Sequence, residues 1–201
     1  MKNSVIQSFL KEQLRESIDI KQALLMDEAT ISIVEQICLL FSESLSSGHK
    51  IMLAGNGGSA ADSQHLAAEL VSRLDFDRPS LSALALTTDT SALTAIGNDY
   101  GYEHIFTRQL HAQARAGDIF VGITTSGKSA NILRAFTECQ KLKVRSVALC
   151  GQAGELDSLV DYCVRVPSRH TARIQECHIL IGHLICSQVE RLLFPDLSNK
   201  R

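Results

Sequence analysis

Apolar residues recur at helical spacing between residues 4 and 47 of this chain. The pattern stops at Ser47-Gly48-His49, which reads as a helix end followed by a turn. Representative members of the stripe are Ile33, Val34, Ile37, Leu40 and Phe41. One or two helices are therefore expected ahead of the first strand.

Beyond residue 50 the pattern changes to short apolar runs that alternate with turn residues and longer helical stretches. The runs expected to be strands are 51–54, 83–86, 119–123, 146–150 and 162–166. Strands that alternate with helices favour a parallel sheet covered on both faces. We expect one α/β domain over residues 1–201, with an N-terminal helical arm at about 1–48.

The last helix is predicted from about Ala172 to about Phe194, where Pro195 ends it. Its apolar residues form more than one stripe, which indicates burial on two sides. Together with the amphipathic N-terminal arm, this pattern favours a homo-oligomer, although a single large core would produce the same pattern.

Charge and composition narrow the possible classes of partner. The formal net charge is -2, from 20 basic and 22 acidic residues spread along the chain, which predicts binding to neither nucleic acid nor an anionic membrane. Polar residues interrupt the first ten positions, so neither a signal peptide nor a spanning helix is expected there. The six cysteines include no C-x-x-C pair and are interpreted as buried thiols of a cytoplasmic protein, without an assigned function.

Two loops have the composition of an anion-binding site. Gly55–Ser59 follows the first strand, and Thr124–Ser129 follows the strand at 119–123. Small and hydroxyl residues ahead of a helix offer N–H and O–H groups to phosphate oxygens, although the same residues can serve only as helix caps.

Two nucleotide motifs overlap these loops, and neither has its full context. Residues 55–60 match G-x-G-x-x-A, but no acidic residue ends the second strand where a ribose-binding carboxylate is needed. Residues 122–129 match G-x-x-x-x-G-K-S, but Gly122 lies within an apolar run and reads as a strand residue. No nucleotide cofactor is expected.

Four polar residues could hold a metal ion. His65 and Glu69 are four apart on the predicted helix after the first loop and therefore share a face. Gln175 and His183 are eight apart on the last helix, about 12 Å along its axis. Imidazole and carboxylate suit zinc, with the amide as a weak fourth ligand. On spacing alone, structural roles for these residues are the more common case.

Four motifs together resemble the phosphoheptose isomerases of the sugar isomerase (SIS) domain family, over nearly the whole chain. They are GNGGSAADSQHLAAE at 55–69, AIGND at 95–99, TTSG at 124–127 and RIQE at 173–176. The resemblance implies a three-layer α-β-α sandwich with a five-stranded, mostly parallel sheet, preceded by N-terminal helices.

The resemblance also implies an activity. Members interconvert sedoheptulose 7-phosphate and D-glycero-D-manno-heptose 7-phosphate through an enediol, as precursors of bacterial surface lipopolysaccharide. The resemblance further implies a homotetramer with active sites between subunits, and many members bind one zinc ion per subunit.

Carried over to matching positions, the family pattern assigns roles to residues of this chain. The metal ligands would be His65, Glu69, Gln175 and His183, and Glu69 and His183 would be the catalytic base and acid. The substrate contacts would be Asn56, Gly57, Gly58, Ser59, Glu69, Asn98, Asp99, Thr124, Thr125, Ser126, Ser129 and Gln175. From the residues alone, the Asn98-Asp99 pair reads equally as a plain turn.

One position departs from the family, and one alternative function stays open. Lys128 stands where members commonly have Asn, and we expect its charge either to strengthen phosphate binding or to face solvent. The resemblance also extends to relatives of similar fold that bind the bacterial replication initiator protein and catalyse no reaction. Those relatives look to have lost the carboxylate at the position of Glu69. The presence of Glu69 favours the enzyme.

Overall fold

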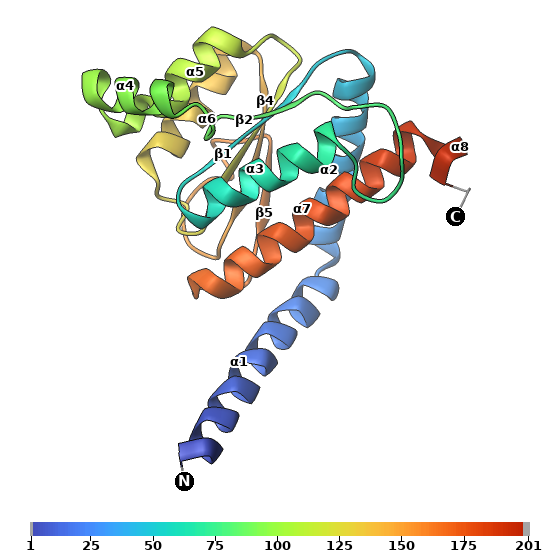
Figure 1. Ribbon diagram of the computed structural model, residues 1–201, viewed down its shortest axis with the longest axis vertical. Helices are drawn as coiled ribbons and strands as arrows, with labels where there is room; N and C mark the ends of the chain where they lie inside the picture. The colour runs from blue at the N-terminus through green and yellow to red at the C-terminus, as the bar shows by residue number, and fades with distance from the viewer. Residues whose placement is uncertain (1, 199–201) are drawn as a thin grey trace.

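The computed structural model describes residues 2–198 of the chain. Helices and strands alternate after two N-terminal helices (Figure 1). The strands are β1 (Ile51–Gly55), β2 (Ala83–Ala85), β3 (Ile119–Thr124), β4 (Arg145–Cys150) and β5 (Tyr162–Arg165). The α-helices are α1 (Lys2–Leu25), α2 (Glu28–Ser46), α3 (Gly58–Val71), α4 (Thr90–Tyr100), α5 (Ile105–Gln113), α6 (Ala130–Leu142), α7 (Thr171–Leu193) and α8 (Pro195–Ser198), and η1 (Tyr102–His104) is a 3-10 turn.

The five strands form one sheet in the order β2-β1-β3-β4-β5, and every neighbouring pair is parallel. Each expected strand is present, within one residue at either end. The fully buried patterns of β1 and β3 explain why these runs are apolar without alternation, since helices cover both faces.

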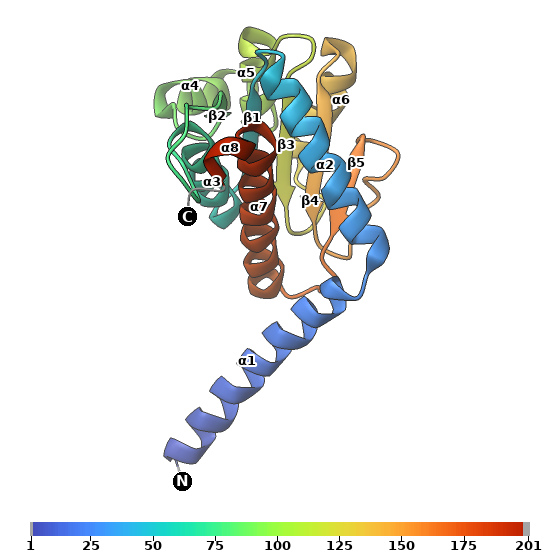
Figure 2. The same cartoon turned by 90° about the vertical axis from the view of Figure 1, so that its right-hand side faces the viewer.

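Two clusters of buried side chains fill the spaces on either side of the sheet, and Figure 2 shows the resulting layers. The first cluster joins the sheet to α2, α3 and α7, with Phe41, Leu66 and Ile181 among its members. The second joins the opposite face to α5 and α6, centred on Phe106, Phe120 and Phe136. The three-layer α-β-α sandwich is confirmed.

The helix α2 is part of the sandwich rather than of a projecting arm. By length and composition alone it could cross a membrane, but its residues Ile37, Cys38 and Phe41 are buried against the sheet and α7. Burial against the sheet and α7 accounts for these three residues, whereas Ile31 and Leu39 of the same helix are exposed.

Helix α1 extends away from the body (Figure 1). The break before α2 occurs at Asp27, whose carboxylate caps α2 by accepting hydrogen bonds from the amide and hydroxyl of Thr30. Arg173 on α7 donates to the backbone oxygen of Gln13, and Ser17 and Lys21 donate to Glu176. These bonds fix α1 at the start of α7.

Candidate active site

The two loops predicted to bind an anion lie side by side at the carboxyl edge of the sheet. The connection after β1 leads to β2 on one side of the sheet, and the connection after β3 leads to β4 on the other side. The direction of the chain through the sheet therefore reverses between β1 and β3. Ligands of open parallel sheets bind at such a switch point. Gly55 pairs with Ile123, which places the starts of the two loops next to each other.

A reciprocal pair of amides joins the loops. Asn56 donates to Asn131 over 3.0 Å, and Asn131 donates back to the Oδ1 of Asn56 over 2.9 Å. Tyr102 also donates to this oxygen, over 3.0 Å. Asn131 is buried, and it was not among the predicted site residues. The pair ties the end of β1 to the start of α6.

The first loop needs its glycines for two different reasons. Gly57 has a φ of 58° and a ψ of -120°, a backbone conformation that a side chain disfavours. Gly55 packs against the backbone of Ser59 and has no space for a Cβ, whereas a Cβ at Gly58 would displace the side-chain amide of Gln175. The start of α3 thereby lies close to Gln175 of α7.

The second loop presents hydroxyl groups and a cation. Thr124 and Ser129 hydrogen-bond through their hydroxyls over 3.1 Å, and Ser129 is the first flanking residue of α6. Thr125 and Ser126 line a cleft of about 420 Å³, and Lys128 shares it. The cleft's other lining residues are Ala153, Ser168, Arg169 and Thr171.

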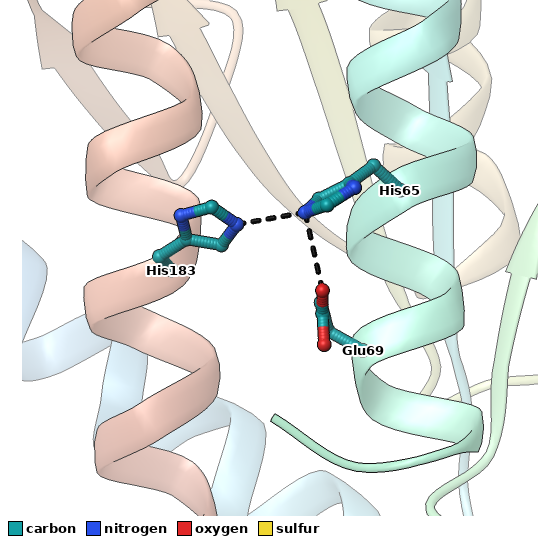
Figure 3. A group of neighbouring side chains, drawn as sticks. All are labelled: His65, Glu69 and His183. Carbon is teal, nitrogen blue, oxygen red and sulfur yellow. Dashed lines mark hydrogen bonds and ion pairs between the residues drawn. The ribbon is translucent and has the colours of Figure 1, made fainter. Parts of the chain in front are cut away.

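Three predicted metal ligands converge between α3 and α7 (Figure 3). The Nε2 of His65 lies 2.8 Å from the Nε2 of His183 and 3.1 Å from the Oε1 of Glu69. All three ligand atoms lie within 4.8 Å of one another. The side chain of Glu69 is 19% exposed, and that of His65 is 48% exposed.

Gly182 explains why the two helices can bring these side chains together. A Cβ at this position would fall 2.5 Å from the side chain of Leu66, the residue after His65. Glycine therefore lets α7 approach α3 closely, and the next residue, His183, reaches His65. A glycine inside an apolar helix otherwise costs roughly 1 kcal/mol relative to alanine.

The three groups together are well suited to a cation. A neutral imidazole carries one hydrogen, so the Nε2 of His65 cannot donate fully to both Glu69 and His183. The nearby Asp62 has a buried Oδ2 without a hydrogen bond, and burial raises the pKa of this carboxyl while His65 opposes the rise. Two nitrogens and a carboxylate form the donor set that zinc prefers, and tetrahedral zinc sets such ligands about 3.3 Å apart, near the distances found here.

Gln175 takes a different position from the other predicted ligands. Its amide lies against Gly58 at the start of α3, two turns before His183 along α7. Its role as a fourth metal ligand stays a prediction, whereas its contact with Gly58 places it beside the first loop.

A buried ion pair holds the end of α3 that carries Glu69. The Nε of Arg78 donates to the Oε1 of Glu190 over 2.9 Å, and both side chains are fully buried. The guanidinium also donates to the backbone oxygens of Glu69 and Leu70. Glu190 in turn accepts from the amides of Leu74 and Asp75. Neither Arg78 nor Glu190 was predicted to act at the site.

The reading of Asn98-Asp99 as a plain turn is wrong, because both residues lie in the last turns of α4, which ends at Gly101 with a φ of 95°. Their side chains are exposed, and Asn98 donates to Asp99 over 2.8 Å. Gly122 lies within β3, as its apolar neighbours indicated, and Phe136 fills the space that a Cβ would need.

Comparisons with known proteins give one consistent answer. The family model of the SIS domain matches residues 16–151, which is more than half of the chain. The chain is 53% identical over 189 residues to a phosphoheptose isomerase of Aneurinibacillus thermoaerophilus, covering 94% of this chain and 96% of the relative. It is 52% identical to phosphoheptose isomerase 2 of Campylobacter jejuni, covering 94% of each.

Solved structures agree with the sequence relatives. The phosphoheptose isomerase of Neisseria gonorrhoeae is 42% identical, with a TM-score of 0.86 over 92% of this chain and 98% of that chain. The phosphoheptose isomerase of Francisella tularensis is 34% identical, with a TM-score of 0.87 and the same coverage. Both the fold and the extent of the chain match.

Proposed function

The chain belongs to the SIS domain family, and on that basis we propose that it is a phosphoheptose isomerase, an aldose-ketose isomerase acting on a heptose phosphate. The substrate pair in this proposal is sedoheptulose 7-phosphate and D-glycero-D-manno-heptose 7-phosphate. The observation that carries it is the convergence of His65, Glu69 and His183 beside a switch-point crevice, in a chain about half identical to enzymes of this name.

In this proposal, different residues contact the phosphate, the hydroxyls and the carbonyl of the substrate. The Thr124–Ser129 loop and the N–H groups at the starts of α3 and α6 bind the phosphate, because they supply uncharged donors at helix N-termini. Asn56, held by Asn131 and Tyr102, meets the sugar hydroxyls. The carbonyl end of the sugar then lies toward His65, Glu69 and His183.

Isomerisation requires a base that removes a proton from one carbon and an acid that returns a proton to its neighbour. Glu69 is the base in this proposal. Its Oε1 contacts His65, and its Oε2 makes no hydrogen bond within residues 2–198 and can accept the proton. His183 is the acid, and it can donate only from a ring nitrogen that does not bind a metal; its neighbour His65 keeps the imidazole directed between the helices.

A zinc ion held by His65, Glu69 and His183, with Gln175 as a fourth ligand, would polarise the substrate carbonyl as a Lewis acid. Glu69 would then use one oxygen as a ligand and the other as the base.

The decisive experiment follows solvent hydrogen into the sugar. The zinc-supplied protein is incubated with sedoheptulose 7-phosphate in D2O, and NMR monitors deuterium at C2 of the heptose 7-phosphate formed. An enediol intermediate predicts a deuterated product. The proposed isomerase activity would be overturned if the folded protein formed no product and exchanged no hydrogen with solvent.

The non-catalytic alternative, a module that binds the replication initiator protein, finds no support. The relatives reported above are named as isomerases, and the carboxylate of Glu69 is in contact with His65. A binding module has no need of a base and two imidazoles at one point.

We also propose that the protein works as a homotetramer in the cytoplasm, and that its product feeds heptose into surface polysaccharide such as lipopolysaccharide. The assembly is supported by apolar side chains that no part of the described chain covers. On α1 they include Val5, Phe9 and Leu14, and on α2 and α7 they include Leu39 and Leu184.

Lys128→Asn is expected to raise KM for the sugar phosphate about two- to fivefold with little change in kcat. The Lys128 side chain is exposed beside the hydroxyl loop and makes no ion pair within residues 2–198. Exposed charge pairs contribute roughly 0.4–1 kcal/mol, which corresponds to this change in affinity. Lys141→Asn is the matched control, because Lys141 pairs with Glu138 at the far end of α6. An unchanged KM in Lys128→Asn would mean that this cation only faces solvent.

A further inference from the structure

Two cysteines meet at the edge of the sheet, outside the candidate active site. Cys150 is the last residue of β4, and Cys163 lies in the edge strand β5. Their Sγ atoms are 3.6 Å apart. Cys150 is buried, whereas Cys163 is half-buried. The two thiols therefore form a pair that a small reagent can reach through Cys163.

The strand register decides what this pair can do. Ala148 pairs with Cys163 and Cys150 pairs with Arg165, so the two cysteines are offset by two residues on neighbouring strands. Strands about 4.8 Å apart with a rise of about 3.3 Å per residue place such Cα atoms about 8 Å apart. A disulfide needs Cα atoms within about 7 Å, so it would have to distort the sheet.

The sulfur separation fits a bridging atom instead. Two thiolates on a tetrahedral centre with bonds of about 2.3 Å lie about 3.8 Å apart. The observed 3.6 Å is close to that separation, whereas a disulfide would require about 2.05 Å. Both sulfurs could therefore bind one soft atom with little movement.

Charges near the pair favour the thiolate. The Nη1 of Arg165 lies 3.7 Å from the Sγ of Cys150, and Asp157 holds this guanidinium through a bond of 2.6 Å to its Nη2. The hydrogen bond from Cys163 and the charge of Arg165 lower the pKa of Cys150, against the effect of burial. The same hydrogen bond raises the pKa of Cys163. The thiolate of the pair is thus favoured at Cys150.

We propose that Cys150 and Cys163 form a bidentate site for a soft, thiophilic metal or metalloid centre, bound through both sulfurs. With a trivalent arsenical as probe, phenylarsine oxide and the two thiols give a cyclic dithioarsenite and one water, without oxidation or reduction. The site adjoins the isomerase site, since Gly151 follows Cys150 and donates to the backbone oxygen of Thr125. It does not depend on the isomerase activity.

The test is titration of the folded, reduced protein with phenylarsine oxide, followed by intact-mass and peptide mass spectrometry. We expect one arsenical per chain, bridging the peptides of Cys150 and Cys163. It should be released by a small dithiol and retained in excess monothiol. Loss of the second sulfur in Cys163→Ser should weaken binding about 100-fold, because the second bond of a linked pair forms at high effective concentration.

Two controls keep the outcome interpretable. Cys139→Ala removes a buried thiol of α6 and should leave binding unchanged, and circular dichroism verifies that each variant is folded. Equal affinity in Cys163→Ser and the unchanged chain would overturn the proposal. A disulfide between Cys150 and Cys163 after diamide treatment of the folded protein would also overturn it, because the sheet would then permit the direct bond.

Discussion

Glu69→Gln is expected to lower kcat for heptose phosphate isomerisation about 10³-fold, within the range typical for loss of a general base. Glutamine has nearly the same shape as glutamate but cannot accept a proton at neutral pH. The contact with the Nε2 of His65 can be kept through the amide oxygen, so the helices α3 and α7 should remain in place. The measurement combines the steady-state rate with deuterium entry at C2 by NMR.

The matched control for this variant is Glu103→Gln, which changes an acidic residue of η1 away from the three-residue cluster. It should retain wild-type kcat. Zinc content and thermal melting of Glu69→Gln are measured alongside, because a fall in activity that zinc addition restores would indicate a ligand role alone. Wild-type exchange in folded, zinc-loaded Glu69→Gln would contradict the assignment of the base.

Glu190→Ala is expected to destabilise the protein by about 3–5 kcal/mol, because it leaves the buried guanidinium of Arg78 without a counter-charge. It also removes the acceptor for the amides of Leu74 and Asp75. For a chain of this length the melting temperature should fall by on the order of 10 °C, measured by thermal denaturation.

A second variant separates charge from packing in this network. Glu190→Gln keeps the shape and most acceptor positions but removes the negative charge, so it should lie between wild type and Glu190→Ala. Glu43→Ala, at an exposed position of α2, is the control and should change stability by no more than about 0.5 kcal/mol. A melting temperature of Glu190→Ala within 2–4 °C of wild type, equivalent to about 1 kcal/mol, would contradict a buried, uncompensated charge.

The sequence predicted the layers well because the strongest local signals agree with the tertiary structure. Apolar runs without alternation mark strands buried on both faces, and all five occur close to their expected positions. The α3 helix begins at its glycine loop, and the i, i+4 spacing places His65 and Glu69 on one face.

Other features depend on neighbours that no local pattern specifies. Asn131 reads as one more polar residue after a hydroxyl loop, and its bond to Asn56 follows only from β1 lying next to β3. Gly182 lies in an apolar helix, which a glycine weakens. Its reason is the close packing of α3, where Leu66 leaves little space for a Cβ. Arg78 and Glu190 are more than a hundred residues apart in the sequence. Each is a charged residue type that is usually exposed, so neither is expected to be buried from the sequence alone.

The single helix α7 carries Gln175, His183 and Glu190, which lie at the first loop, at the three-residue cluster and at the buried ion pair. Inserting or deleting one residue between them would rotate everything beyond it by about 100° around the helix axis. A single substitution along α7 affects one of these points, but a change in the length of the helix between them would misalign all three at once. Length variation compatible with this fold must therefore fall outside the segment of α7 from Gln175 to Glu190.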